Sequence, residues 1–263
     1  MFDIAPHIIV TALVSGMIIG VFLGAFGGGG SVLAAPLLLY LVGVDDPHVA
    51  IGTSAAAVAA IALFSLAGHW RGGRVKWPCA AVFAGSGLVG SVIGSSVAKA
   101  INGDVLLLGF ALAMAAIALS MFRKPKSEGD PDVHISPAIM MRLAPIGLVV
   151  GLAAGFFGIG GGFLIVPGLM LAAGMTMANA TASSLVSVAI FGGATSANYA
   201  LSGMVDARLI VLLLIGGAIG GAVGIFISRL LSERIQLARA LFAMMILAVS
   251  VYVAFQAVSA LAA

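Results

Sequence analysis

The chain has 263 residues, of which 62% are hydrophobic and 8% are charged, with a formal net charge of +3. A water-soluble domain carries roughly 25% charged residues, so this composition excludes one. The basic residues lie in short loops between apolar runs, which excludes a nucleic-acid-binding surface and indicates the charge bias of membrane topology. The single cysteine, Cys79, excludes an internal disulfide.

Apolar segments follow one another along the whole chain. In order they are 8–26, 31–43, 49–70, 77–98 and 104–122, and then 143–157, 162–174, 180–200, 208–228 and 240–261. Lipid offers no partner for backbone polar groups, so continuous apolar runs must form helices, and we predict an all-α polytopic membrane protein. The segments 31–43 and 162–174 are short for a crossing, which needs about 20 residues. They favour re-entrant or broken helical hairpins.

The two halves of the chain resemble each other. Alignment of Gly16 with Gly147 gives nine identities in 21 ungapped positions, and one gap extends the match to Gly94 and Gly224. A match by composition alone is the alternative, and the length of the alignment argues against it. We predict two transmembrane repeats, 1–122 and 143–263, each with one glycine-tipped hairpin and three transmembrane helices, joined by a cytoplasmic linker, 123–142.

The distribution of basic residues predicts the orientation of the halves. Lys and Arg fill the loop 71–76 and the linker, whereas in the second half they fill the later loop, 229–239. Positively charged loops face the cytoplasm. The bias thus changes loops between the halves, as an inverted repeat requires, and we predict that both termini lie outside.

Each predicted hairpin has a glycine cluster at its tip, before a short helix that begins near Ser31 or Phe163. The first N–H groups of a helix lack partners and carry the positive end of its dipole, and glycine lets a ligand approach them closely. Two tips that meet inside the membrane would bind an anion without any charged side chain. The candidate tip residues are Gly27, Gly29, Gly30 and Ser31 in the first half, and Gly158, Gly160, Gly161 and Gly162 in the second.

Hydroxyl and amide side chains on two spans are further candidates for this site. They are Thr53 and Ser54 in the first half, and Ser183, Ser184 and Asn198 in the second. On the span 180–200, polar residues three or four positions apart lie on one helical face and would line a cavity. The alternative is that these groups bond their own or a neighbouring helix, and for glycines spaced four apart, such as Gly16 and Gly20, we expect packing only.

Other chemistries find no support in the sequence. No His, Cys and Glu cluster suggests a metal, no P-loop suggests ATP, and no acidic residue in the apolar cores suggests an acid–base pair, so we expect neither a cofactor nor an enzyme. His69, beside Trp70 at the end of a span, is interpreted as a solvated interfacial histidine. A role in proton coupling is the alternative.

The segments GVFLGAFGGGGSVLAAP and GLAAGFFGIGGGFLIVP, with AIGTSAA and ATASSLV after them, resemble the TauE/SafE family of sulfite exporters. The resemblance covers roughly residues 8 to 255. It implies a secondary transporter of the bacterial inner membrane that exports small sulfur oxyanions or organosulfonates. By residue match it points to Gly27, Gly29 and Gly30, and to Gly158, Gly160 and Gly161; Ser31 stands where the second half has Gly162.

A different class of function stays open, namely a non-transporting assembly or sensing component of the membrane. Such a protein would tolerate bulky residues at both glycine tips. For the transporter, the expected partners are a small anion and the lipid bilayer, with a homodimer left open.

Overall fold

A computed structural model describes residues 6–121, 129–158, 162–231 and 235–262. Gly160 and Gly161 lie outside these ranges, as do parts of the linker and of the loop 229–239. The elements are α1 (Pro6–Phe26), η1 (Gly27–Leu33), α2 (Ala34–Leu37), η2 (Leu38–Val42), α3 (Pro47–Arg71), α4 (Trp77–Ala98), α5 (Gly103–Met121), α6 (Pro137–Phe157), α7 (Gly162–Ala173), α8 (Met177–Ala200), α9 (Ala207–Leu231) and α10 (Ile235–Ala262). The protein is all-α, as its composition predicts, and seven described segments are long and apolar enough to cross a membrane.

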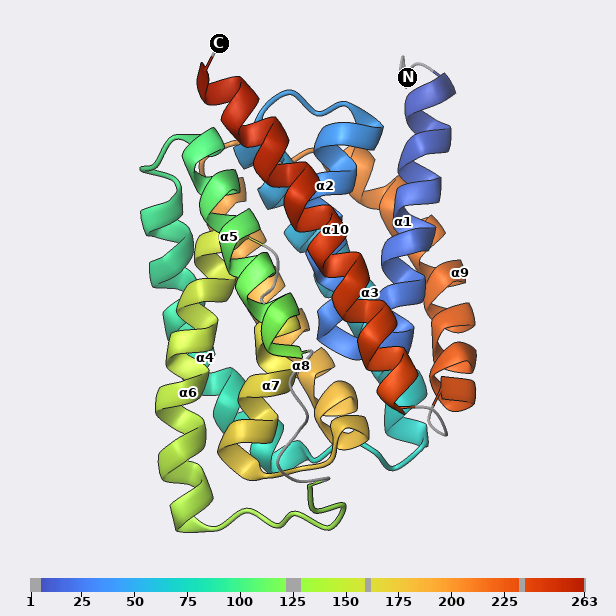
Figure 1. Cartoon of the computed structure of the whole chain (residues 1–263), viewed down its shortest axis with the longest axis vertical. Coiled ribbons are helices and arrows are strands. Elements are labelled where there is room, and N and C mark those ends of the chain that lie inside the picture. The colour runs from blue at the N-terminus through green and yellow to red at the C-terminus, as the bar shows by residue number, and fades with distance from the viewer. Residues whose placement is uncertain (1–5, 122–128, 159–161, 232–234, 263) are drawn as a thin grey trace.

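The first hairpin runs from α1 through a 3₁₀-helix, η1, into α2 and the π-helical turn η2. The stretch Pro6–Val42 has 37 residues and by length alone would be a single span. It nevertheless turns back, because Ala12 near its beginning and Val42 at its end pack in one buried cluster with Leu209 (Figure 1). The hairpin therefore returns to the end of the molecule at which it begins.

The second hairpin consists of α6 and α7 and enters from the opposite end of the molecule (Figure 1). Gly168 of α7 faces Val150 of α6 and Phe83 of α4. Helix α1 begins at the end where both termini lie, and α6 begins at the other end (Figure 1). The fold thus brings two hairpin tips from opposite ends into the middle of the helix bundle.

Helices α3 and α8 form the centre of the bundle. In each of them 72% of the most apolar 18-residue stretch is buried inside the protein, compared with 33% for the corresponding stretch of α6. They cross antiparallel, since Gly192 of α8 approaches the Ala55 carbonyl of α3, while Gly52 approaches Tyr199 near the end of α8. Both hairpins pack against this central pair.

Glycines spaced four apart join two parallel helix pairs, α1 with α9 and α4 with α6. A Cβ on Gly20 would lie 2.7 Å from the Gly221 amide nitrogen, and one on Gly94 would lie 2.8 Å from the Phe156 amide nitrogen. Such distances require the absence of a side chain, so these glycines serve close helix packing, as their spacing predicts. Each pair joins a hairpin of one half to a helix of the other half.

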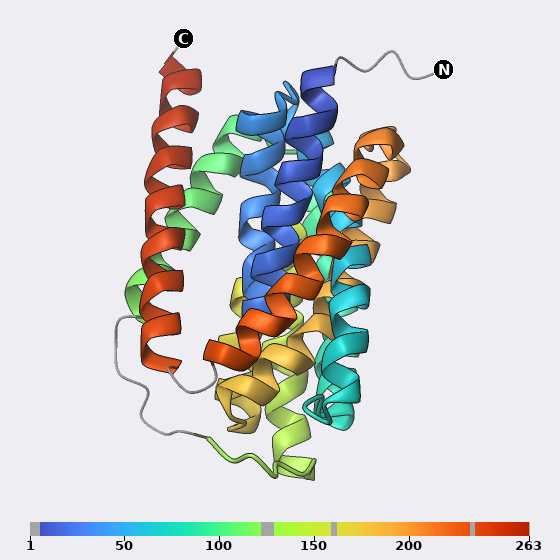
Figure 2. The ribbon, with the colours of Figure 1, turned by 90° about the vertical axis from the view of Figure 1, so that its right-hand side faces the viewer.

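Helices α5 and α10 pair along one side of the molecule (Figure 2). Their buried residues, including Phe110 and Met114 of α5 and Ile246 of α10, form a cluster with Val32 and Leu33 of the first hairpin. This pair therefore covers the returning arm of that hairpin.

Candidate functional site

Each hairpin turns at a glycine in the left-handed conformation. Gly27 follows α1 with φ of +63°, and Gly158 follows α6 with φ of +67°. A side chain in this region costs about 1–2 kcal/mol, so both turns favour glycine. At the first tip the prediction of a loop before a helix near Ser31 was wrong, because η1 already begins at Gly27 and glycines fit its tight turns. At the second tip α7 begins at Gly162, next to the predicted Phe163.

The two tips touch each other through their backbones. A Cβ on Gly28 would lie 2.7 Å from the Gly162 Cα, and a Cβ on Gly162 would overlap the Gly28 carbonyl. Gly27, Gly29, Gly30 and Ser31 are all buried beside this contact. The predicted meeting of the tips is thus observed for their described residues, and Gly160 and Gly161 lie outside them.

Each tip rests on the central helix of the other half. Gly27 lies against Thr181 and Ser184 of α8, where a Cβ would be 2.9 Å from Ser184 Oγ. Gly158 lies against the side chain of Ile51 on α3. The first tip therefore has hydroxyl groups beside it, whereas the second tip has an apolar side chain.

Polar contacts gather at the first tip. The Gly28 amide donates to Ser184 Oγ at 3.0 Å, and this hydroxyl donates to the Thr181 carbonyl at 2.7 Å. Ser31 Oγ donates to the Gly28 carbonyl at 2.8 Å. The Ser184 oxygen thus accepts the backbone N–H of Gly28 in this arrangement. Ser31 and Ser184 lie together beside the point where the tips meet.

Ser54 is the first-half counterpart of Ser184 in the internal alignment. It donates to the Ile51 carbonyl of its own helix at 3.1 Å. Ile51 contacts Gly158, so Ser54 lies one helical turn from the second tip. Its hydroxyl is fully buried.

Thr53 and Ser183 hold loops rather than tips. Thr53 Oγ1 accepts from the Asp206 amide at 2.9 Å, and Ser183 Oγ accepts from the Lys76 amide at 2.9 Å. Both residues are fully buried. Each hydroxyl therefore anchors a loop of the opposite half to a central helix, and the structure does not bring either one into the tip contacts.

Asn198 lies far from the tips. It follows Ser184 by 14 residues on α8, which is about 21 Å along the helix axis. Its side chain accepts from Lys99 Nζ at 2.9 Å and donates to Ser95 Oγ at 2.7 Å. Asn198 thus joins α8 to the end of α4, and the expectation that it lines the same cavity as Ser184 is not met, because Phe191 between them packs on Phe83.

His69 differs from its sequence interpretation as a solvated residue. Its side chain is 1% exposed, and Nε2 lies 3.1 Å from the Gly24 carbonyl at the end of α1. The neighbouring Trp70 is 62% exposed, so adjacent residues at this end of α3 lie on a buried and on an exposed face of the helix. Burial on one helical face this close to a span end depends on the partner helix, which the sequence does not reveal.

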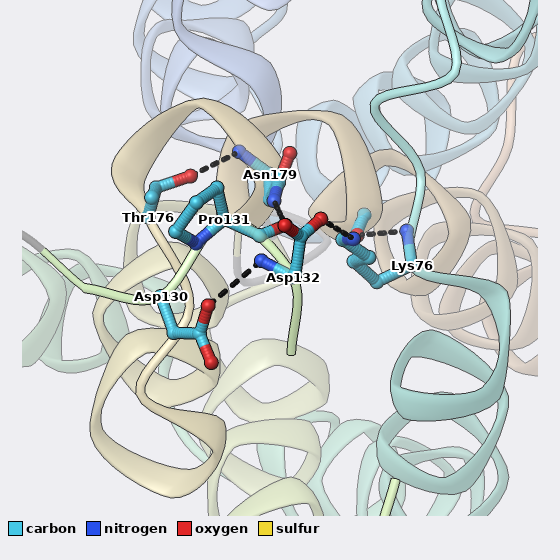
Figure 3. Close-up of polar contacts among 7 residues, drawn as sticks. Lys76, Asp130, Pro131, Asp132, Thr176 and Asn179 are labelled. Carbon is cyan, nitrogen blue, oxygen red and sulfur yellow. Dashed lines mark hydrogen bonds and ion pairs between the residues drawn. The ribbon is translucent and has the colours of Figure 1, made fainter. Parts of the chain in front are cut away.

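The described part of the linker closes over the beginning of α8 (Figure 3). The Asp130 amide donates to the Gly174 carbonyl at 2.8 Å, and Asn179 Nδ2 donates to the Pro131 carbonyl at 2.9 Å. Lys76 Nζ lies 3.9 Å from an Asp132 carboxylate oxygen. Because Asp132 is 89% exposed, this ion pair contributes little stability, and the backbone contacts hold the linker in place.

Comparison of the sequence with known proteins shows the family of the chain. The model of the family described as sulfite exporter TauE/SafE matches residues 12–253. A probable membrane transporter protein of Xylella fastidiosa (strain 9a5c) is 41% identical over 256 residues, covering 97% of this chain and 98% of the relative. The probable membrane transporter protein YunE of Bacillus subtilis is 30% identical over 242 residues, covering 84% and 88%.

No solved structure matches the chain. The family match extends over both hairpins and both central helices, and the relatives are named as membrane transporters. Together with the spans of the fold, these matches show that the chain is a multi-pass membrane protein that belongs to the TauE/SafE family of membrane transporters.

Proposed function

We propose that this transporter exports small sulfur oxyanions such as sulfite, or organosulfonates, across the bacterial inner membrane, and that the two hairpin tips form the anion site. The observation that carries the proposal is the Gly28 amide, which binds the oxygen of Ser184 at the point where the tips meet. The family description supports the substrate class.

The tips suit an anion because of what surrounds them. Residues 4–44 and 143–205 contain no Asp, Glu, Lys or Arg, so an anion there meets no repelling carboxylate and no side-chain cation. An isolated charge is strongly unfavourable in an apolar medium and needs oriented donors. The positive ends of the helices that begin at the tips, η1 and α7, supply such donors.

Backbone contact between Gly28 and Gly162 leaves the tips closed upon each other in this arrangement. Transport then requires the hairpins to part, each along the glycine-rich partner helix against which it packs. We infer an alternating movement, in which the hairpin of 1–122 and the hairpin of 143–263 open toward opposite sides. The beginning of α1 and of α6 at opposite ends of the molecule supports an inverted repeat of this kind (Figure 1).

The orientation in the membrane belongs to the same proposal. Both termini lie at one end of the molecule, and the loop 72–76 lies at the other end, as does the beginning of α6 (Figure 1). The basic residues of 71–76 and of the linker then mark the second end as cytoplasmic. Both termini would face outward.

Flux through purified protein tests the proposal. Proteoliposomes loaded with radiolabelled sulfite, taurine or thiosulfate should release the substrate faster than protein-free vesicles. Gly29→Val, which places a branched side chain in the buried first tip, should abolish release and anion binding. Gly193→Val is the matched control, because a Cβ at Gly193 meets open space.

The outcome also separates the two classes of function. A transporter loses flux in Gly29→Val while the variant keeps the size-exclusion profile of the parent protein. A non-transporting assembly or sensing component would show no flux in the parent and no effect of bulk at the tips. That result would overturn the proposal.

A further inference from the structure

Among the described residues, three titratable side chains are buried, namely His69, Cys79 and Tyr199. Of these types, only histidine ordinarily changes charge between pH 5 and 8. His69 is also the one that contacts a hairpin of the proposed anion site. Its position therefore suggests a role that the proposed function leaves unassigned.

His69 holds the last turn of α1, directly before the first tip. Helix α1 ends at Phe26, and carbonyls in the last turn of a helix are those that lack regular partners. His69 Nε2 lies 3.1 Å from the Gly24 carbonyl, which only accepts, so Nε2 carries a hydrogen. Gly24 precedes Gly27, where the tip begins, by three residues. The imidazole is thus adjacent to the tip that carries the Ser184 contact.

The segment 4–44, which includes this tip, carries no Lys or Arg that could neutralise an anion. Helix ends supply only partial charges, equivalent to roughly half an elementary charge. Buried charges in proteins are ordinarily paired. A protonated His69 would supply the missing unit of charge without a permanent cation in the apolar span.

The charged groups around His69 are few. Along α1, residues 8–26 contain none, and along α9 the residues 209–228 contain none. On its own element and the following loop, Arg71 is exposed, Arg74 and Lys76 are half-buried, and Lys76 Nζ lies 3.9 Å from an Asp132 carboxylate oxygen. The side chains of Arg229, Arg234 and Arg239 lie outside the described part of the chain.

We propose that His69 is a proton-binding site linked to the anion site: the imidazole takes up one proton when an anion binds at the first tip and releases it when the anion leaves. This inference rests on the proposed function, because the linked ligand is the transported anion. Proton and anion then favour each other's binding. Anion affinity is high at acidic pH and falls as pH rises through the titration of His69.

Calorimetry on detergent-purified protein tests the linkage. The probe is methanesulfonate, whose charge is constant over the measured range, and binding is measured from pH 5 to 8 in two buffers of different ionisation enthalpy. We expect the parent protein to take up close to one proton per anion, and its affinity to fall about tenfold per pH unit above the titration range. In His69→Gln, whose amide still donates to the Gly24 carbonyl, proton uptake and the pH dependence should disappear.

The other histidines provide matched controls, since the chain has four. A variant with His7→Gln, His48→Gln and His134→Gln retains His69 alone and should keep both proton uptake and the pH dependence. This variant also decides the question if His69→Gln does not fold. Binding without proton uptake in the parent, or loss of uptake in the triple variant, overturns the proton site and leaves the anion site standing. No binding of methanesulfonate, sulfite or taurine in the parent overturns both proposals.

Discussion

The first tip contacts hydroxyl groups of α8, whereas the second tip contacts the apolar side chain of Ile51 on α3. The tips align in the sequence, and both turn at a glycine with positive φ. They differ because each one rests on the central helix of the opposite half, and those helices carry Thr181 in one case and Ile51 in the other. A repeated backbone turn therefore has different chemical surroundings at the two tips.

The same asymmetry continues one helix away. His69 on α3 aligns with Tyr199 on α8, and both are buried. His69 contacts the Gly24 carbonyl before the first tip, whereas Tyr199 stacks on His48 with ring centroids 6.0 Å apart. These two aligned residues thus have different partners, a backbone carbonyl for His69 and an imidazole ring for Tyr199.

If the two hairpins enter from opposite sides of the membrane, a thiol reagent outside the cell should label one end of the molecule and not the other. In a Cys79→Ser background, a single cysteine at Ser202 should react with an impermeant thiol reagent in intact cells, and one at His134 should not. Ser202 follows α8 at the end that holds both termini, and His134 lies in the linker at the other end. Labelling of position 134 alone would reverse the orientation, and labelling of both in sealed cells would contradict the topology.

Backbone contact between the tips predicts the largest effect on stability. Gly162→Ala places a methyl group against the Gly28 carbonyl, where neither backbone has room to move. We expect a loss of about 3 kcal/mol, at the upper end of the cost of overpacking. Thermal unfolding in detergent, followed by size-exclusion chromatography, measures it. Gly193→Ala is the matched control and should be neutral or stabilising, because that glycine lies in a helix and faces open space.

Truncation of the central-helix side chain beside each tip should distinguish the two tips by its effect on stability. Gly158→Ala and Gly27→Ala each force a side chain into the left-handed region, at a cost of about 1–2 kcal/mol. At Gly158 the added methyl group also meets the side chain of Ile51, so Ile51→Ala should relieve it with a coupling of about 1 kcal/mol.

At Gly27 the methyl group overlaps the Thr181 carbonyl, which Thr181→Ala leaves in place. In double-mutant cycles of the free energy of unfolding, the coupling between Gly27→Ala and Thr181→Ala should therefore be less than about half of the coupling between Gly158→Ala and Ile51→Ala. Equal couplings at both tips would show that the neighbouring side chain does not distinguish them.

The hydroxyl beside the first tip predicts the smallest effect. Ser184→Ala removes the acceptor of the Gly28 amide and should weaken sulfite binding by about 1 kcal/mol, or roughly fivefold. Asn198→Ala should leave binding unchanged, because Asn198 lies about 21 Å from Ser184 along α8. Calorimetry checks both variants, and equal loss in Ser184→Ala and Asn198→Ala would place the site elsewhere.

Composition and spacing alone determine much of this protein. The scarcity of charge requires membrane helices, since lipid cannot satisfy an exposed backbone, and glycines spaced four apart predict close helix pairs. The short segments after the glycine clusters predict hairpins. Each of these conclusions follows from local properties of the chain, namely hydropathy, length and the absence of a side chain.

Only the tertiary structure decided which polar groups reach the tips. Ser183 and Ser184 are adjacent in sequence, yet one holds the Lys76 amide and the other the Gly28 amide. Asn198 shares a helical face with Ser184 but lies several turns away, and His69 is buried by a helix distant in sequence. The partner of a side chain depends on the crossing of α3, α8 and the hairpins, and helical periodicity specifies a face without specifying what packs against it.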